Sequence, residues 1–563
     1  MSELEQTSAM GVARLRRLAR HPRLKNLINR IRRLNLVWLI LLPLLGIALA
    51  MLLMQSLGIV GWDAPAHLYK VALLRQYKSV FWDNDWYGGD YTVISYGFVF
   101  YWLARFVSYN VLVIVGSGFM PLFFYLYLRR VYGTISYWPA AALAAVLLIY
   151  LSNGQDPFLF AMSFMMAAMV LVVYGRPLLA AVPAAISLFT NPVALVIGAV
   201  FLLADFIARP QTRRHYYLFA LSLLPFVAVR VLVGVLFYEK ATYMYPLAEV
   251  IHFAGFGMVG FVLARASHDR ERGPKQVLYL TFAAIAVLFA IVPNPVGWNI
   301  GRFFFLFGLP LLLDIHKTYL PRLLVVIVLV SFAFGQLTSP ITHYFRVADM
   351  PSTHAAFFTP ALQFAAAHYN PDYRSHVVAL DTHWEAYYFS INGFPITRGW
   401  YRQSDAVHNQ VLSENFTADQ YVRWLRSLAV NYVYLPNAPL DWSGTRETQI
   451  LTTSPQFTRV FSDKDWRIYK LARPQPLAIS LDGGKPAHVL VLQHQSLYLQ
   501  APAKGRYLVR ITYSPFWELT AGLATLRQGS GDFLELDASK AGYYGLRVNV
   551  TVDSSLRQLI RAF

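Results

Sequence analysis

The sequence predicts a polytopic α-helical membrane domain of about eleven spans, followed by an exported α/β domain and a β-sandwich domain. Three observations support this fold class. The 563-residue chain is 56% hydrophobic and only 14% charged, whereas soluble proteins are nearer half apolar and a quarter charged. Long uncharged segments alternate with basic clusters over the first 340 residues. Beyond residue 340 the composition turns polar, and no segment there can cross a bilayer.

The charge of the chain fits a membrane protein. The formal net charge is +19, but Lys and Arg in membrane proteins gather in cytoplasmic loops and set the orientation. We therefore infer no nucleic-acid partner. Residues 1–35 hold many of these cations, and we expect them to form a cytoplasmic N-terminus. The chain has no cysteine, which excludes disulfides, thiol nucleophiles and Cys-ligated metals.

The transmembrane domain is predicted over residues 36–339. Its first segment, 36–60, is uncharged, and about 20 apolar residues suffice to cross a bilayer. The basic clusters between segments fall on one side, which we assign to the cytoplasm of a multi-pass plasma-membrane protein. Loop 61–110 and the C-terminal region then lie outside. The other ten predicted spans are 111–128, 135–152, 157–174, 177–190, 192–208, 216–237, 246–265, 275–292, 302–316 and 321–339.

The exported region divides near a proline-rich junction at 471–480. We expect an α/β domain over 340–475, because 376–400 and 430–436 show strand-type alternation and 421–428 is typical of an amphipathic helix. Short alternating segments separated by Gly, Asp and Ser predict a β-sandwich over 476–563.

The large first outer loop, 61–110, concentrates the candidate chemistry. Asp63 comes two residues after the first apolar run, and His67 follows four residues later on the same face of a predicted short helix. Carboxylates there can bind sugar hydroxyls, ligate a hard cation or act as a base. Each residue also has a plain explanation, as a solvated loop aspartate or an interfacial aromatic anchor. The candidates are Asp63, His67, Asp83, Asp85 and Asp90, framed by Trp62, Trp86 and Tyr87.

This layout resembles the GT-C superfamily of integral-membrane glycosyltransferases, whose members place an acidic residue in a large first outer loop. The similarity lies in Trp62-Asp63-Ala64-Pro65-Ala66-His67-Leu68-Tyr69 and in Trp86-Tyr87-Gly88-Gly89. It is closest to prokaryotic multispan proteins labelled 6-pyruvoyl-tetrahydropterin-synthase-related, although no pterin chemistry is visible in this sequence. The tail is similar too, in 398–405, 424–436 and 511–519.

The resemblance implies an inverting transfer of a sugar from a polyprenyl-phosphate or polyprenyl-diphosphate donor to a glycan, lipid or protein acceptor outside the membrane. Asp63 would deprotonate or orient the acceptor hydroxyl. Asp83 or Asp85 would hold the acceptor or a metal. A divalent cation, Mg²⁺ or Mn²⁺, is left open, with Asp63, Asp83 and Asp85 as its candidate ligands.

The leaving phosphate requires positive charge near the outer boundary of the membrane. Arg302 stands at the outer start of a predicted span, and Arg230 lies in the outer half of 216–237 with Lys240 just beyond. An Arg within a span is costly and usually faces a cavity or a partner. The alternatives are snorkelling for Arg302 and an ion pair with a neighbouring span for Arg230.

Three further residues are candidates for lining the substrate cavity. Asp156 is predicted in an outer loop, where solvation is the plain alternative. His252 falls within a predicted span, where an interhelical hydrogen bond would explain it equally. Arg398 belongs to the segment RGWYRQSD (398–405), which would either cover the active site or pack between domains. Asn191-Pro192 is typical of a turn between two helices.

Three classes of function fit a chain of this kind: a lipid-dependent glycosyltransferase, a transporter or flippase of lipid-linked glycans, and a non-catalytic assembly protein. A transporter would show internal symmetry with interrupted helices in corresponding halves, and no repeat is visible. An assembly protein would not need the carboxylates of the first loop or Arg230. The sequence therefore favours the enzyme, with a polyprenyl-linked sugar, a glycan or lipid acceptor and membrane lipid as its partners.

Overall fold

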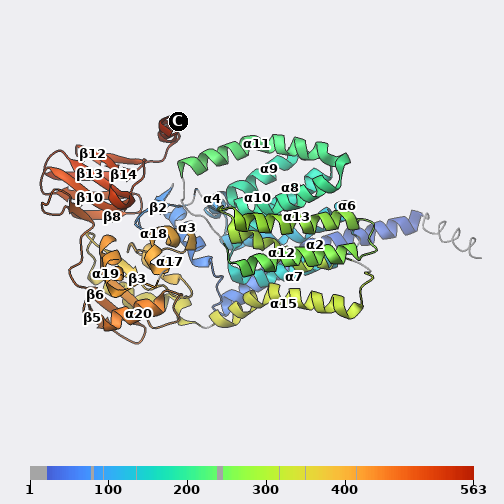
Figure 1. Ribbon diagram of the computed structural model, residues 1–563, viewed down its shortest axis with the longest axis horizontal. Coiled ribbons are helices and arrows are strands. Elements are labelled where there is room, and N and C mark those ends of the chain that lie inside the picture. Colours follow the sequence, from blue (N-terminus) through green and yellow to red (C-terminus); the bar gives the residue numbers. More distant parts are fainter. Residues whose placement is uncertain are drawn as a thin grey trace, which may run out of the picture.

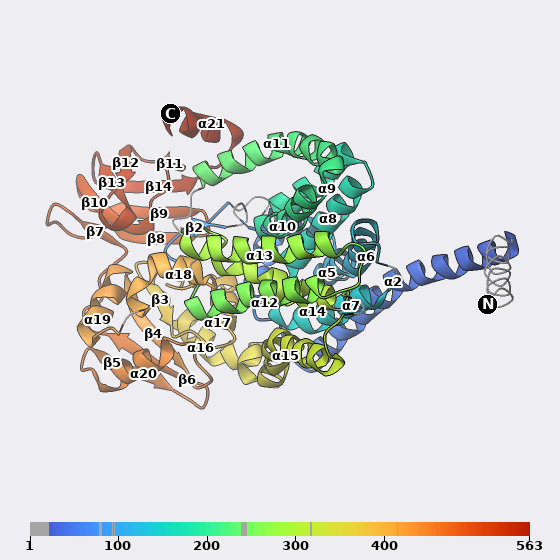
Figure 2. The same cartoon turned by 45° about the vertical axis from the view of Figure 1, so that its right-hand side comes forward.

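The molecule consists of a bundle of long helices, one end of which is covered by two smaller domains (Figures 1 and 2). We call this end the domain-facing end of the bundle. The computed structural model describes residues 22–77, 81–92, 94, 96–134, 136–237, 245–315, 318–348, 350–413 and 415–562, except the side chains of 22–35, 402–403 and 561–562. Residues 1–21 of the predicted cytoplasmic N-terminus therefore lie outside the described residues.

The bundle follows the predicted apolar segments closely. Each of the eleven segments contains helix, and the predicted turn at Asn191-Pro192 separates two helices, with the Asn191 side chain accepting from the Val193 amide. The helices are α2 (Pro22–Ser56), α5 (Tyr109–Gly118), α6 (Met120–Val131), α7 (Trp138–Tyr150), α8 (Asp156–Val173), α9 (Pro177–Thr190), α10 (Pro192–Ala208), α11 (Arg213–Leu236), α12 (Leu247–Arg265), α13 (Arg272–Ile291), α14 (Arg302–Leu312) and α15 (Arg322–Val347).

The outer surface of this bundle is suited to lipid. Among the described residues, seven helical stretches are long and apolar enough to cross a membrane. Leu45 and Leu52 on α2 each leave 64% of their surface exposed, and Phe334 on α15 leaves 71%. Exposed apolar faces of this length are found in contact with bilayers. The chain is thus a multi-pass membrane protein, while the count of eleven spans stays a prediction because α7, α9, α10 and α14 are shorter.

Ion pairs join the helix connections at the opposite end of the bundle. Arg209 lies 3.2 Å from Glu271, and Lys275 lies 3.0 Å from Asp314. Thr134 also donates to Asp314 at 2.6 Å. These connections include several of the basic clusters seen in the sequence, so that end is charged and separate from the domain-facing end. Which end faces the cytoplasm stays a prediction.

The α/β domain is built on a four-stranded sheet in the order β3-β4-β6-β5. Strand β3 runs parallel to β4, and β6 is antiparallel to both β4 and β5. The predicted amphipathic helix is present as α19, which begins with a capping box at Thr417. The elements are β3 (Arg374–Val377), β4 (Val430–Pro436), β5 (Phe457–Ser462), β6 (Trp466–Leu471), α16 (Ala355–Ala367), α17 (Trp384–Ile391), α18 (Arg402–His408), α19 (Ala418–Ser427) and α20 (Gly444–Thr453).

The strand-type interpretation of 376–400 is wrong for most of its length. Only its first two residues belong to strand β3, and α17 occupies Trp384–Ile391. The segment is rich in aromatic residues, which favour strands in general. Here Trp384, Ala386 and Phe389 are buried, and the helix packs against the first loop. Tertiary packing therefore decided the structure of this segment over its local pattern.

The predicted β-sandwich is present at the C-terminal end. Its two sheets have the orders β12-β13-β10-β7 and β11-β14-β9-β8. In β9 the buried residues Leu497, Leu499 and Ala501 alternate with less buried ones, as expected for a strand with one face in the core. The elements are β7 (Ala478–Ser480), β8 (His488–Gln493), β9 (Ser496–Ala501), β10 (Gly505–Thr512), β11 (Trp517–Ala521), β12 (Ala524–Gln528), β13 (Phe533–Ala538), β14 (Gly542–Val548) and α21 (Val552–Ala562).

The first loop lies between the bundle and both domains. It contains α3 (Ala64–Gln76), the short hairpin of β1 (Trp82–Asp83) and β2 (Asp90–Tyr91), and α4 (Phe98–Ala104). Tyr69 and Leu73 of α3 share an apolar core with the α/β domain. Trp82 belongs to the core of the sandwich. The loop therefore connects the three parts of the molecule.

Candidate functional site

The candidate site lies at the domain-facing end of the bundle, where the first loop meets the starts of several helices. A close approach between two glycines positions it. A Cβ atom on Gly61 would lie 2.4 Å from the Cα atom of Gly154. This contact lets the Trp62 and Asp63 amides donate to the carbonyls of Ser152 and Asn153, each at 3.1 Å. Asp63 is thereby held beside the turn that precedes α8.

Asp63 stands at the N-terminus of α3, and a residue of the α/β domain covers it. The indole Nε1 of Trp400 donates to Asp63 Oδ1 at 3.1 Å. The Asp63 side chain is half-buried. The loop around Trp400 therefore contacts the first loop at the residue for which the resemblance implies the role of base.

Arg302 begins α14 and is buried at the same end of the bundle, with 9% of its surface exposed. Its guanidinium lies 4.6 Å from the centre of the Phe158 ring. Two of its nitrogens, Nε and Nη1, have no hydrogen-bond partner among the described residues. Burying unpaired donors of a cation is expensive, so such a group usually serves a ligand.

Asp63 and Arg302 are within electrostatic reach of one phenol, that of Tyr96. Burial raises the pKa of Tyr96, the positive charge of Arg302 lowers it, and the negative charge of Asp63 raises it. The structure thus brings the predicted base and one predicted phosphate ligand into a single polar region.

His67 lies one helical turn after Asp63, and its backbone amide donates to the Asp63 carbonyl. Burial lowers the pKa of His67 to about 3, helped by the positive charges of Lys70 and Arg302. The imidazole is therefore neutral. Its Nδ1 is 2.7 Å from the Tyr101 hydroxyl, while Nε2 has no partner within the described part of the chain.

Asp156 is the first residue of α8 and accepts from the Tyr109 hydroxyl at 2.5 Å. Tyr109 also lines a groove of about 670 Å³ between α3 and α17, together with Leu68, Trp384 and Tyr387. Asp156 is thus joined through Tyr109 to a groove whose lining includes four aromatic residues, Tyr109, Trp384, Tyr387 and Tyr388. Such walls suit sugars, whose C–H faces stack on aromatic rings.

Asp83 and Asp85 form a second cluster, away from the contact between Asp63 and Trp400. They meet His494 of the sandwich, whose Nδ1 is 3.1 Å from Asp83 Oδ1 and 2.7 Å from Asp85 Oδ2. Tyr69 donates to Asp83 Oδ2 at 2.9 Å. Burial raises the pKa of Asp85. Burial also lowers the pKa of His494, but the two carboxylates outweigh it and raise this pKa to about 11.

The metal ligands suggested by the sequence do not all lie together. Asp83, Asp85 and His494 are the one group among the described residues in which three ligand atoms gather, all within 4.8 Å of one another. Asp63 is held instead by Trp400. An oxygen–nitrogen set of this kind fits a divalent cation at the second cluster.

The aromatic residues that were predicted to line the cavity connect the first loop to its neighbours, the α/β domain and α15 of the bundle. Trp86 is buried and donates from Nε1 to the Ala386 carbonyl and to Ser390 Oγ, both at 3.0 Å. Trp62 stacks on His343 of α15 at 4.9 Å. The Tyr87 hydroxyl accepts from the Tyr401 amide at 2.7 Å. Asp90 is half-buried on β2.

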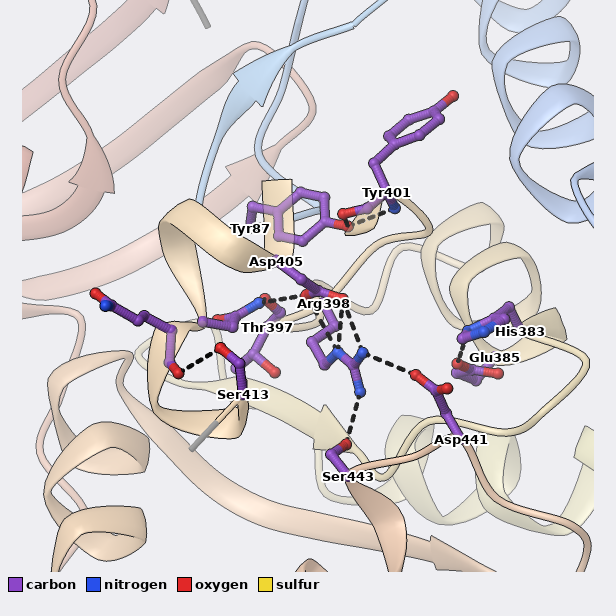
Figure 3. Close-up of polar contacts among 12 residues, drawn as sticks. Tyr87, His383, Glu385, Thr397, Arg398, Tyr401, Asp405, Ser413, Asp441 and Ser443 are labelled. Carbon is purple, nitrogen blue, oxygen red and sulfur yellow. Dashed lines mark hydrogen bonds and ion pairs between the residues drawn. The ribbon is translucent and has the colours of Figure 1, made fainter. Parts of the chain in front are cut away.

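Arg398 is the centre of a polar network in the α/β domain that includes Asp405, Asp441 and Ser443 (Figure 3). Its guanidinium donates to Asp405 at 2.7 Å, to Asp441 at 3.2 Å and to Ser443 Oγ at 3.1 Å. All three nitrogens are engaged, so the side chain holds the segment that leads to Trp400. The segment RGWYRQSD (398–405) therefore does both things that the sequence analysis considered: its Trp400 contacts Asp63, and its Arg398 packs within the α/β domain.

Three predicted site residues remain: Arg230 on α11, His252 on α12, and Lys240, which is not among the described residues. Arg230 is half-buried on α11, near the turn where Val233 and Leu236 pack on the sandwich. His252 is exposed on α12 and lies edge-on to Phe304 at 4.8 Å. Lys240 falls outside the described residues. Their roles stay predictions.

Several residues of the site were not predicted from the sequence. Trp400, His494, Tyr69 and Tyr96 reach their partners from distant segments or from unremarkable positions. Trp400 had a weak signal, because it belongs to the RGWYRQSD segment. His494 had none, since a histidine in a β-turn of a sandwich has no distinguishing pattern.

Comparison with known proteins finds no matching family model and no matching curated protein. Among solved structures, the chain is similar to the mycobacterial arabinofuranosyltransferase AftD, with a TM-score of 0.47 and 15% identity over 79% of this chain and 42% of that one. The chain thus spans about two fifths of that protein.

Two structures of archaeal oligosaccharyltransferase from Archaeoglobus fulgidus are similar with a TM-score of 0.39 and 11% identity. One, AglB in complex with an inhibitory peptide and a dolichol-phosphate, is matched over 67% of this chain and 66% of that chain. The apo form is matched over 71% and 70%.

Fold and site together define a multi-pass membrane protein with a polar site beneath its C-terminal domains. Sequence identities of 11–15% do not transfer an activity to this chain, so its activity has to be inferred from its own residues. The resemblance to the pyruvoyl-tetrahydropterin-labelled set stays an expectation, because no family model matches.

Proposed function

We propose that this chain is a membrane glycosyltransferase that moves a sugar from a polyprenyl-phosphate or polyprenyl-diphosphate donor to an acceptor outside the membrane. The observation that carries the proposal is the buried Arg302, whose Nε and Nη1 have no partner among the described residues, in the same polar region as Asp63. An anionic group such as a phosphate can accept hydrogen bonds from these two nitrogens of Arg302. The N-terminus of α14, where Arg302 lies, also favours negative charge through the helix dipole.

The location of the site supports a lipid-linked donor. Arg302 lies at the domain-facing end of a bundle in which other helices, such as α2 and α15, expose apolar faces. A donor with an isoprenoid tail in the bilayer can therefore present its phosphate to the guanidinium. Arg is well suited to phosphate because its planar fork can donate two parallel hydrogen bonds.

The chemistry follows from the carboxylate. The acceptor hydroxyl attacks C1 of the sugar, and Asp63 takes its proton. The bond between C1 and the phosphate oxygen breaks, and this oxygen keeps the bonding electron pair, so the polyprenyl phosphate or diphosphate leaves as an anion. Because the hydroxyl attacks from the opposite face, the configuration at C1 inverts. General-base assistance of this kind contributes about 10²–10⁴-fold. The Trp400 indole, which donates to Asp63, helps to orient this carboxylate.

The acceptor has an accessible route in the groove of about 670 Å³ between α3 and α17. Tyr109 belongs to the wall of this groove, and its hydroxyl donates to Asp156. A glycan or glycolipid headgroup would stack on Tyr387 and Trp384 while its hydroxyl approaches Asp63.

The test uses the full-length protein in nanodiscs with radiolabelled synthetic polyprenyl-phosphate sugars. Arg302→Gln is expected to lose binding of a short-chain polyprenyl phosphate, because the anion loses its cationic partner. Asp63→Asn is expected to keep that binding and to lose sugar transfer by about 10²–10⁴-fold. The matched control is Arg130→Gln at the other end of the bundle, where Arg130 is exposed.

Several outcomes would contradict the proposal. Movement of intact donor between leaflets without cleavage would identify a transporter. Wild-type binding by the Arg302 variant, or undiminished transfer by a folded Asp63 variant, would remove the assigned roles. A chain that binds no polyprenyl phosphate would fit the assembly class instead.

A further inference from the structure

Asp83, Asp85 and His494 bring together two segments about 410 residues apart in the chain. The two aspartates flank Asn84 in the hairpin of the first loop, and His494 lies in the turn between β8 and β9 of the sandwich. Their candidate ligand atoms all lie within 4.8 Å of one another. We call these three residues the Asp–Asp–His cluster.

The cluster is fixed by its surroundings. The Asp85 amide donates to Asp83 Oδ1 at 3.1 Å, and the Tyr69 hydroxyl donates to Asp83 Oδ2 at 2.9 Å. Asn84 ties the hairpin to the sandwich, since its amide donates to the His494 carbonyl at 2.9 Å and its Nδ2 to the Gln493 carbonyl at 2.7 Å. The three ligand groups are therefore oriented before any ion binds, which lowers the cost of binding.

Burial makes positive charge necessary here. Asp83 and Asp85 keep only 3% and 2% of their surface exposed, and a buried carboxylate is stable only when it is paired or coordinates a metal. A protonated His494 supplies one positive charge against two carboxylates. A divalent cation would supply two charges and would bind the imidazole as a neutral ligand, leaving a neutral cluster.

We propose that the Asp–Asp–His cluster binds one divalent transition-metal ion, such as Mn²⁺ or Zn²⁺, which fastens the first loop to the sandwich. Metal bonds of about 2.0–2.2 Å place neighbouring ligand atoms about 3 Å apart, and the observed separations from His494 Nδ1 are 2.7 and 3.1 Å. The imidazole favours these ions over Mg²⁺ and Ca²⁺, which prefer oxygen ligands.

This ion is distinct from a cation at the reacting sugar. Asp63 is engaged by Trp400 and is not part of the cluster. The ion would join the hairpin that follows α3 to the most distant domain of the chain. Its role is to hold the sandwich on the loop, and it does not depend on which reaction the protein performs.

The test is a titration of purified full-length protein, treated with EDTA and then dialysed, with Mn²⁺ followed by electron paramagnetic resonance. We expect one bound ion per chain in the wild type. His494→Gln and Asp85→Asn should weaken binding by at least about 100-fold, because each removes a direct ligand. Asp63→Asn is the matched control and should bind Mn²⁺ as the wild type does.

A second measurement needs no variant, in case the substitutions disturb the contact between loop and sandwich. Mn²⁺ bound to the wild type should show hyperfine coupling to an imidazole nitrogen, and hydrogen exchange at the β8–β9 turn should slow when the ion is added. The absence of stoichiometric binding at micromolar Mn²⁺ or Zn²⁺, or the absence of nitrogen coupling, would overturn the proposal. Loss of binding in Asp63→Asn would overturn it as well, by assigning the ion to the other site.

Discussion

Trp400 is the residue through which the α/β domain reaches the first loop at Asp63. Its indole lies under His383, with ring centres 3.5 Å apart, and His383 has a φ of +54°. A non-glycine residue held in this conformation is strained, and such strain is retained where the surroundings enforce it. The stack fixes the ring whose N–H donates to Asp63.

Replacing Trp400 by Phe should lower the rate of sugar transfer. The substitution keeps an aromatic ring and removes the N–H group that donates to the carboxylate. Hydrogen bonds to charged groups contribute about 1.5–3 kcal/mol, so kcat should fall about 10- to 100-fold. The KM for the donor should change little, because Trp400 contacts Asp63 whereas the donor phosphate is proposed to bind Arg302. Initial rates with the labelled donor measure both constants.

The matched control is Trp424→Phe. The Trp424 indole nitrogen makes no hydrogen bond to any described residue, and the residue lies on α19, within the α/β domain. Its loss should leave kcat unchanged. An unaltered kcat in the Trp400 variant would show that the indole does not position Asp63.

At the scale of elements, the position of α3 depends on the contact between Gly61 and Gly154. The loop before α3 and the turn before α8 approach so closely that no side chain fits on Gly61. Because Asp63 is the residue that precedes α3, a shift of this loop moves the carboxylate. The element is thus positioned by backbone contact and by its apolar core with the α/β domain.

Gly61→Ala should therefore reduce transfer although it changes no reactive group. Its Cβ would lie 2.4 Å from Gly154 Cα, and a displacement of about 1 Å in a catalytic group costs about 10²-fold. Rates and donor binding should be measured on protein that elutes as a single species. Gly273→Ala is the control, since nothing lies within 4 Å of its added Cβ. Equal rates for both variants would disprove the positioning role of this contact.

At the scale of the whole molecule, one loop fastens three bodies together. Tyr69 and Leu73 bind it to the α/β domain, and Trp82 binds it to the sandwich. Trp82 is 1% exposed and makes edge contacts with Trp517 and Tyr91. The domains therefore cover the site through apolar contacts as well as through the polar contact at Trp400.

Trp82→Ala should loosen the sandwich without unfolding the bundle. Removing a buried Trp side chain destabilises the folded state by about 3–5 kcal/mol. Because Trp82 packs in the sandwich core, the contact between loop and sandwich is the one that weakens. Hydrogen exchange in β8 and β9 should become faster, while exchange in the bundle helices stays the same. Trp442→Ala serves as the control because Trp442 is 50% exposed. Unchanged exchange in the Trp82 variant would contradict this account of the interface.

The sequence was most informative where one physical requirement dominates. A span must be long, apolar and helical, because lipid offers no hydrogen bonds to the backbone, and all eleven predicted segments contain helix. The alternation of apolar and polar residues predicted the strands of the sandwich, such as β8, β9, β10, β13 and β14, because one face of each strand must be buried. Segment 384–391 was misassigned because its aromatic residues suit a strand and a buried helix alike, and only its packing against α3 decides.

The amino-acid sequence by itself determined the membrane class, the helical segments and the sandwich strands, since each depends on local composition or periodicity. The cost of burying charge pointed to Arg302, and the resemblance to the GT-C superfamily pointed to Asp63. Only the tertiary structure decided the partners: Trp400 over Asp63, Gly154 against Gly61 and His494 between Asp83 and Asp85. The physical reason is that these contacts join segments tens to hundreds of residues apart. Their geometry follows from how the domains pack, which no local pattern records.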